Sequence, residues 1–398
     1  MIWGLELIGV IGAAIALGAF VMTVCNLKRL PIPARVGGSR SGRRLCVGIP
    51  ARNEAENIEA CVRSVLGGGV EDVRVLVYDD QSDDGTTDIV SRLATEDHRV
   101  EVVPTEAMPS GWCGKQHGCW RIATHAMACC GLSERDWLLF IDADVRIEPD
   151  GLRRTLVHAD SIDRDGKLGV LSTFPRQITR SLGETLLVTA IFFVLLSYLP
   201  FGRMRRTLSP AASAGCGQYM LIRCDCYEAF GGHEAIKDSM HDGVRLPRLA
   251  RRSGFRTDLF DGADVARCRM YNGFGQAWRG FAKNAYEGLG SLGLLVFLTV
   301  LHVVGHIAPP IVFPLAVLVS IGASDPTWIA IVASGSAVLL GIGQRLMIAV
   351  RERHSLSAAP LHSVSVALMT AVQWWSWYLD RTGRRSWRGR TLGEAGTT

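Results

Sequence analysis

Residues 3–25 form an apolar run that contains a single charged side chain, Glu6. A helix of this length crosses the roughly 30 Å hydrocarbon core of a bilayer. Basic residues follow the run instead of preceding it, and no small-x-small motif marks a cleavage site, so the run predicts a membrane anchor and not a cleaved signal peptide. Apolar segments return after residue 288. We therefore expect membrane helices at both ends of a more polar middle region.

Basic residues gather beside the first apolar run. Six Lys or Arg and no acid lie within residues 26–44, and the positive-inside rule predicts that this side faces the cytoplasm. The net charge of +5 suits anionic lipid headgroups, and no basic stripe interleaved with aromatic residues indicates a nucleic-acid partner. The eleven Cys form no pair of C-x-x-C motifs. In a cytoplasmic domain they are expected to be reduced, and to act as small buried side chains.

The C-terminal apolar region allows two topologies. Its apolar segments are residues 289–321, 328–349 and 361–379. A hairpin at Pro309-Pro310 gives four crossings and a cytoplasmic tail, whereas one kinked span gives three crossings and a cytoplasmic 351–354. Four crossings are preferred because the tail carries five Arg within 381–390. His302 and His306 share one helical face in this region, where packing between helices is favoured over a transport pathway.

The middle of the chain alternates short apolar runs with helical patterns. Strands are predicted at 45–50, 73–78, 99–104 and 137–141, with helices capped by Asn53 and beginning near Thr86. This order predicts an α/β fold in which helices flank a mostly parallel sheet. No G-x-G-x-x-G opens a helix after the first strand, and the glycine run at 67–69 is expected to end a helix. A Rossmann dehydrogenase is therefore not favoured.

Polar and acidic residues follow three of the four predicted strands, at the sheet edge where ligands collect in α/β folds. They are Pro50, Ala51, Arg52, Asn53 and Glu54 after the first strand, Asp79 and Asp80 after the second, and Asp142 and Asp144 after the fourth. The last two converge if the chain stays extended, or divide the work if it turns. Two neighbouring carboxylates repel unless a cation lies between them, and Mg²⁺ or Mn²⁺ is typically held by one or two carboxylates plus phosphates. The alternative is a capping Asp142 and a solvated Asp144.

Two further signals lie beside these strand ends. Asp79 or Asp80 can accept hydrogen bonds from a nucleobase or ribose, while Asp83 or Asp84 is expected to cap the following helix. Lys115, after the glycine-containing turn in PSGWCGKQHG, is a candidate contact for a diphosphate. A solvated loop lysine is the alternative.

Four motifs, in this order, resemble the family 2 glycosyltransferases with a GT-A fold. They are P-x-R-N-E at 50–54, D-D-x-S-x-D-G-T at 79–86, G-W-x-G-K at 111–115 and D-x-D at 142–144. Residues 231–254 are similar to the family's acceptor-side loop, and 275–289 to its Q-x-x-R-W region. The resemblance implies that Asp242 is the general base and that Gln276 and Arg279 assist catalysis. It further implies a metal at Asp144 assisted by Asp142, and donor binding by Pro50, Ala51, Asn53, Glu54, Asp79, Asp80, Lys115 and Asp142.

The activity implied by the resemblance is transfer from a nucleotide sugar, taken to be a UDP-sugar, with inversion at the anomeric carbon. Two departures qualify it: His241-Asp242 replaces a pair of acids, and Arg279-Gly280 replaces the Arg-Trp of processive polysaccharide synthases. The chain is more similar to membrane-associated members that glycosylate carotenoids, hopanoids or related lipids. A lipid hydroxyl or carboxyl is therefore the expected acceptor, at the plasma (inner) membrane with the catalytic domain in the cytoplasm. A small processive synthase, and a scaffold or transporter with a degenerate glycosyltransferase domain, remain as alternatives.

The expected organisation combines these segments. Residues 183–206 are interpreted as an interfacial amphipathic helix, with a buried core helix as the alternative. The full order is an anchor at 1–26, a basic linker at 27–43, a donor-binding half at 44–182, the interfacial helix at 183–206, an acceptor-side half at 207–287, a membrane bundle at 288–380 and a basic tail at 381–398.

Overall fold

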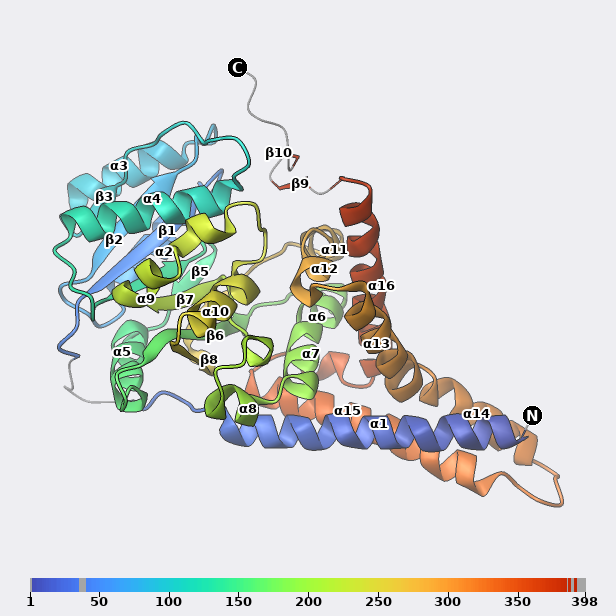
Figure 1. The fold of residues 1–398 in the computed structure, drawn as a ribbon. Coiled ribbons are helices and arrows are strands. Elements are labelled where there is room, and N and C mark those ends of the chain that lie inside the picture. Colours follow the sequence, from blue (N-terminus) through green and yellow to red (C-terminus); the bar gives the residue numbers. More distant parts are fainter. Residues whose placement is uncertain (1, 36–40, 385, 388–389, 392–398) are drawn as a thin grey trace. The chain divides into compact units, whose positions relative to one another are not determined.

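The computed structural model describes residues 2–35, 41–384, 386–387 and 390–391. The chain divides into two compact units (Figure 1). Unit 1 comprises Met1–Arg29, Gln177–Pro200 and Tyr271–Arg384, and unit 2 comprises Leu30–Arg176, Phe201–Met270 and Arg385–Thr398. Residues 36–40 of the predicted basic linker, and most of the predicted basic tail, lie outside the described residues.

Unit 2 is built on an eight-stranded sheet with the order β3-β2-β1-β4-β7-β6-β8-β5. Strands β3, β2, β1 and β4 are parallel, β7 is antiparallel to β4 and β6, and β5 is antiparallel to β8. The predicted α/β sheet is therefore confirmed, with a parallel half followed by an antiparallel half. The strands are β1 Leu45–Ala51, β2 Arg74–Asp79, β3 Val100–Val102, β4 Trp137–Ile141, β5 Val145–Ile147, β6 Leu168–Gln177, β7 Tyr219–Arg223 and β8 Arg256–Cys268.

Helices cover both faces of this sheet, which explains why its strands read as continuous apolar runs. One core lies under α2 Ile58–Leu66, α3 Thr86–Glu96 and α5 Gly151–Ile162, and the other lies under α4 Gly114–Cys129, α9 Cys224–Ala229 and α10 Asp242–Arg252. In β4, Trp137 and Leu139 enter the first core, while Leu138 and Phe140 enter the second. Unit 2 also contains the short helix α8 Phe201–Arg206, 3-10 turns at Pro210–Ala212 and Gly232–Ile236, and a two-stranded antiparallel sheet of β9 Ser386–Trp387 and β10 Arg390–Thr391.

The four predicted strands and the helix beginning at Thr86 are present, but the predicted helix cap at Asn53 is wrong. Asn53 has a positive φ of 53°, and the helix begins only at Ile58. The intervening residues turn instead of coiling, because the amide groups of Asn57 and Ile58 both donate to the carbonyl of Glu54. Asn and Asp tolerate this left-handed conformation better than most residues.

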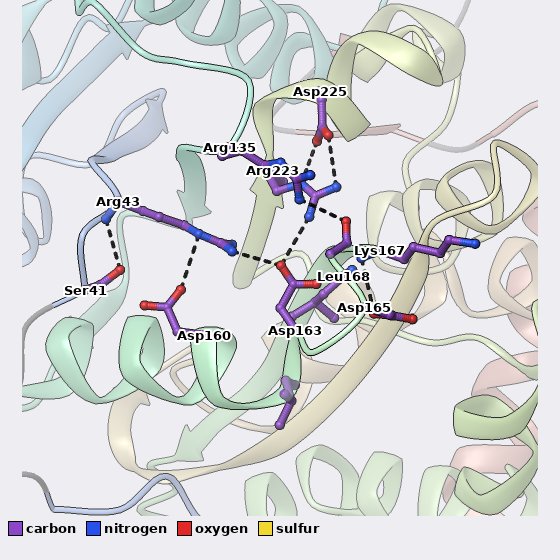
Figure 2. Close-up of polar contacts among 12 residues, drawn as sticks. Ser41, Arg43, Arg135, Asp160, Asp163, Asp165, Lys167, Leu168, Arg223 and Asp225 are labelled. Atoms are coloured by element: carbon purple, nitrogen blue, oxygen red, sulfur yellow. Dashed lines mark hydrogen bonds and ion pairs between the residues drawn. The ribbon is translucent and has the colours of Figure 1, made fainter.

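A buried ion-pair cluster ties the residue pair before β1 to the end of β7 and to Asp163, which follows α5 (Figure 2). Asp163, whose side chain is 0% exposed, accepts from Arg43 at 3.0 Å and pairs with Arg223 at 3.3 Å. Its other oxygen accepts the amide of Leu168 at 2.8 Å. Arg223 is fixed on its second side by Asp225 at 2.7 Å. The end of the predicted linker is thus anchored by Arg43.

We predict that Asp163→Asn destabilises unit 2 by about 3 kcal/mol, because it leaves Arg43 and Arg223 without their shared buried carboxylate. Urea titration of the purified full chain, read by proteolysis of unit 2, measures the change. Asp165→Asn is the matched control: Asp165 pairs with Arg256 at 2.7 Å but is 47% exposed, so its loss should cost about 1 kcal/mol or less. Equal losses for the two variants would contradict the structural role assigned to Asp163.

Unit 1 is helical. Its elements are α1 Ile2–Arg29, α6 Leu182–Val188, α7 Ala190–Tyr198, α11 Phe274–Ala282, α12 Ala285–Leu289, α13 Leu292–His302, a π-helix at Val303–Ile307, α14 Pro309–Ser320, α15 Trp328–Arg351, a 3-10 turn at Leu356–Ala358 and α16 His362–Arg381. Among the described residues, Trp3–Arg29 and Trp328–Arg351 are long and apolar enough to cross a membrane. Leu292–Ile307 and Pro309–Ser320 together provide a third candidate, bent by 43°.

The bend and the α6–α7 segment differ from expectation. A bend of 43° does not reverse the chain, so Pro309-Pro310 does not form the preferred hairpin. The segment predicted as one interfacial helix forms α6 and α7, which belong to unit 1, and α8, which belongs to unit 2. Within unit 1, Gln344 of α15 donates to Thr23 at 2.6 Å and to Ser197 at 2.8 Å. This buried polar contact fixes α7 between α1 and α15, so α7 is a packed helix and not a surface one.

Candidate functional site

The loops that follow β1 and β2 are locked to each other by hydrogen bonds. The Asp83 amide donates to the Asn53 side chain at 3.0 Å, and the Glu54 amide donates to the Thr86 hydroxyl at 2.9 Å. Both oxygens of Asp79 accept side-chain hydroxyls, from Ser82 and Thr87. The predicted donor-side residues Pro50, Ala51, Asn53, Glu54, Asp79 and Asp80 therefore do lie at one rim of the sheet.

The two acids of this rim have different local partners. Asp79 acts as a brace inside the loop, because its carboxylate is already engaged by neighbouring hydroxyl groups. Asp80 is also largely buried, and Arg52 pairs with it at 3.4 Å. Asp79 and Asp80 thus lie side by side at the end of β2, one held by hydroxyl groups and the other paired with an arginine.

Asp142 and Asp144 divide between two environments because the chain turns after β4. The Val145 amide donates to the Asp142 carbonyl at 3.0 Å, and Arg146 donates to the Ala143 carbonyl at 2.9 Å, which closes the turn. Asp142 is left with a side chain that is 32% exposed. Asp144 is partly buried, and its Oδ1 is closed off from solvent. Of the two arrangements allowed by the sequence, the structure has the second.

Lys115 joins the fourth strand end to the start of α10. Its ammonium group lies 2.6 Å from Asp142 Oδ1 and 3.0 Å from Asp242 Oδ2, and it donates to the Gly217 carbonyl at 3.1 Å. Lys115 lies in the first turn of α4, not in a solvated loop. Burial alone would lower its pKa, but Asp142 and Asp242 outweigh burial and hold the pKa well above its ordinary value. Asp242 is influenced in the opposite sense: burial opposes its ionisation, yet Lys115 keeps its pKa below the usual value.

A glycine makes room for the Asp242 carboxylate. A side chain at Gly217 would overlap that carboxylate, so it would force Asp242 to move. The carboxylate also accepts the Gly243 amide at 2.7 Å. The loop before β7 therefore forms the floor on which Asp242 rests, and it fixes where Asp242 meets Lys115.

Asp144 has the properties of a cation ligand. Burial, followed by the charges of Asp142 and Glu54, raises its pKa to about 7. Its buried Oδ1 has no hydrogen-bond partner among the described residues, and an unpartnered buried oxygen is costly. The described part of the chain contains no cluster of three or more His, Cys, Asp or Glu arranged to hold an ion. One or two carboxylates completed by ligand phosphates is the usual pattern for Mg²⁺ or Mn²⁺, so Asp144 and Asp142 fit such an ion.

Two predicted residues lie outside this group. Gln276 and Arg279 belong to α11 of unit 1, where both are exposed. Gln276 accepts the Asn272 amide at 2.9 Å and so supports the start of its helix. Gly280 is explained by its neighbour, because any side chain there would overlap the ring of Tyr271. A tryptophan at this position would not fit.

The sequence analysis did not identify two residues that pack against the acids of the site, Gly217 and Cys268. Gly217 left a weak signal in the small-residue run SAGCG before β7. Cys268, at the end of β8, accepts from Gln218 at 3.0 Å, and it also contacts Asp144. No motif marked Cys268, because its role depends on β8 pairing with β5 immediately after the Asp142–Asp144 turn.

We predict a strong energetic coupling between Lys115 and Asp242. Lys115→Met should destabilise unit 2 by about 2 kcal/mol, since it leaves two partly buried carboxylates unpaired. The double variant Lys115→Met/Asp242→Asn should recover at least about 1 kcal/mol relative to the sum of the single variants. Urea titration in EDTA, without nucleotide, measures all four proteins. Simple additivity would contradict the ion pair.

Known glycosyltransferases are similar in sequence to this chain. Residues 46–231 match the model of a family described as Glycosyl transferase family 2. The 4,4'-diaponeurosporenoate glycosyltransferase of Staphylococcus aureus (strain USA300) is 27% identical over 254 residues, which is 62% of this chain and 62% of that protein. The same enzyme from the bovine strain RF122 / ET3-1 is also 27% identical over 254 residues. The match thus spans less than two thirds of the curated relatives' length.

A solved structure gives the same fold. The mannosyltransferase PcManGT from Pyrobaculum calidifontis, in complex with GDP-Man and Mn²⁺, superposes with a TM-score of 0.57 at 18% identity, covering 93% of this chain and 99% of that chain. The GT-A-like arrangement of sheet, flanking helices and long apolar helices is therefore shared.

Proposed function

Because the chain belongs to glycosyltransferase family 2, we propose that it transfers a sugar from a UDP-sugar to a lipid. The acceptor group is a hydroxyl or carboxyl of a carotenoid, hopanoid or other polyprenoid lipid. The curated relatives, named for glycosylating 4,4'-diaponeurosporenoate, support an acceptor of this class. The two or three candidate membrane helices support an acceptor that resides in a bilayer.

The observation that carries this proposal is the lysine bridge between Asp142 and Asp242. Asp142 follows a strand of the parallel half of the sheet, on the donor side, and Asp242 begins the helix that follows the acceptor-side loop. Lys115 contacts both at 2.6 and 3.0 Å. The donor-side acid and the acceptor-side acid are therefore bridged by a single lysine side chain. A direct displacement requires the donor and the acceptor to be held this close together.

For a hydroxyl acceptor, the chemistry is a single displacement with inversion. The acceptor oxygen forms a bond to the anomeric carbon, the bond from that carbon to the diphosphate oxygen breaks, and Asp242 takes the hydroxyl proton. Asp242 is ionised and therefore ready to accept a proton, because Lys115 holds its pKa low. Lys115 lies near the leaving group in this arrangement and donates to the departing diphosphate.

The donor-side loops hold the nucleotide. Asn53 and Glu54 line the rim with Pro50 and Ala51, and Asp80 accepts hydrogen bonds from the base or ribose. Asp79 acts indirectly by bracing the loop through Ser82 and Thr87. Arg279 is proposed to donate to the diphosphate, and Gln276 to assist catalysis. Gly280 next to Arg279, required by the packing of Tyr271, supports transfer of one sugar over processive synthesis.

Mg²⁺ or Mn²⁺ is the proposed cofactor, held by Asp144 with help from Asp142. The buried, unpartnered Oδ1 of Asp144 supports this assignment. When bound, the ion supplies positive charge that neutralises the leaving diphosphate. Binding also relieves the repulsion among Asp144, Asp142 and Glu54 that raises the Asp144 pKa.

The enzyme is proposed to reside in the plasma (inner) membrane as a multi-pass protein. Nucleotide sugars are water-soluble, and the basic residues after the first apolar helix favour a cytoplasmic position for the segment that follows it. The catalytic unit is therefore placed in the cytoplasm.

We expect Asp242→Asn to lower the rate of sugar transfer by about 1000-fold, because it removes the proton acceptor. The assay incubates the full chain with Mn²⁺, a radiolabelled UDP-sugar panel and GDP-mannose, and extracted polyprenoid lipids, and it follows label entering the lipid phase. Asp72→Asn, an exposed acid at the opposite edge of the sheet, is the control and should retain full activity. Unchanged transfer by Asp242→Asn would refute its role as base, and a ladder of long products would favour a polysaccharide synthase.

Metal binding is tested separately from activity by thermal unfolding. Mn²⁺ with UDP should raise the melting temperature of the wild type and leave Asp144→Asn unchanged. In EDTA at pH 8, Asp144→Asn should be as stable as the wild type or about 1 kcal/mol more stable, because the wild-type carboxylate is then ionised above its raised pKa. An equal Mn²⁺ response in both proteins would remove Asp144 from the metal site.

A further inference from the structure

Helix α8 presents two arginines that have no acidic partner. Its third arginine, Arg205, points inward and pairs with Asp258 at 2.9 Å. Arg203 and Arg206 are exposed and make no ion pair among the described residues. The Arg206 side chain reaches only the carbonyl of Gly202, at 3.0 Å.

Helix α10 likewise has one inward arginine and others without an acidic partner. Its inward arginine, Arg251, is buried and donates to Thr257 at 2.7 Å and to two carbonyl groups of the α8 segment, those of Met204 at 2.7 Å and Thr207 at 2.6 Å. Arg248 and Arg252 lie four residues apart on one helical face. Neither has an ion pair in the described part of the chain.

Arg251 brings the two helices together. Because it donates to the carbonyl groups of Met204 and Thr207, the end of α8 lies beside the end of α10. We call the set Arg203, Arg206, Arg248 and Arg252 the basic face. Helix α8 contains no acid, and the one acid of α10, Asp242, is occupied by Lys115. No nearby carboxylate on either helix therefore neutralises the basic face.

The guanidinium group of Arg248 lies in an unfavourable electrostatic environment. Its Nε is buried and has no hydrogen-bond acceptor in residues 41–384. Burial, followed by the like charges of Arg245 and Arg252, lowers its pKa. A half-buried guanidinium among like charges is stabilised when an anion approaches.

We propose that the basic face binds the anionic headgroups of a bilayer surface. Three features favour a membrane over other anionic partners. Leu208, two residues after the end of α8, is 41% exposed, and a leucine beside arginines is the pattern of an interfacial segment. Helix α10 has no aromatic residue and the one in α8, Phe201, is buried, so the bases of a nucleic acid find no ring to stack on. The candidate membrane helices of the same chain also favour a bilayer as the partner.

This surface is separate from the chemistry of sugar transfer, so its test does not depend on the proposed function. The full chain is reconstituted in nanodiscs of neutral phosphatidylcholine, or of phosphatidylcholine with about one third phosphatidylglycerol. Phenylglyoxal then modifies accessible arginines, and mass spectrometry reads each site. We expect the arginines of the basic face to be modified about fivefold more slowly in the anionic nanodiscs. A change of this size is expected if each arginine contacts about one anionic headgroup. Arg63, 51% exposed on α2 at the opposite face of the sheet, should react equally in both.

Two further arms make the result decisive. Free glycerol phosphate added to neutral nanodiscs should give no protection, and protection equal to that by anionic lipid would instead indicate a soluble-anion site. In Arg248→Gln/Arg252→Gln, protection of Arg203 and Arg206 should fall at least twofold, because the four charges act on one surface. Absence of lipid protection in the wild type, or undiminished protection in the variant, would overturn the proposal.

Discussion

The ammonium group of Lys115 is the interaction on which the site depends. It meets acceptors from three segments that are distant in sequence: Asp142 after β4, Asp242 at the start of α10 and the Gly217 carbonyl before β7. Two carboxylates at this spacing would repel without it. The parallel half of the sheet supplies Asp142, the antiparallel half supplies the loop containing Gly217, and α4 places Lys115 between them. The order of the strands thus brings these charged groups together at one place.

Much of the fold follows from the sequence because its strands are buried on both faces. Runs such as 137–141 contain only apolar residues, which leaves a central strand as the natural interpretation, and the acids that follow mark the sheet edge. Local backbone geometry was less predictable. Asn53 was predicted to cap a helix but takes a left-handed conformation, and Lys115, for which a solvated loop position was the alternative, lies in the first turn of α4. The turn after Asn53 is closed by local hydrogen bonds to the Glu54 carbonyl, whereas Lys115 meets acceptors from distant segments.

The parts that sequence could not provide depend on packing between remote segments. The sequence around Gly217 does not indicate that Asp242 packs against this glycine. The sequence around Cys268 does not indicate that this cysteine contacts Asp144. Apolar content also failed to distinguish a surface helix from a packed one, since α7 is held between α1 and α15 by Gln344. The arginines of α8 and α10 could not be distinguished from sequence either. Arg205 and Arg251 turn inward and bond to Asp258 and Thr257, and only the structure separates them from the other arginines of these helices.

The most direct test of the central arrangement is the turnover of Gly217→Ala. Its added methyl group overlaps the Asp242 carboxylate and so displaces that group from Lys115. Gly42→Ala, where a methyl group meets no atom, is the matched control. We predict that Gly217→Ala loses at least about 100-fold in kcat, consistent with loss of a positioned base, while nucleotide affinity stays near that of the wild type. Wild-type turnover by Gly217→Ala would contradict the placement of Asp242 as the base.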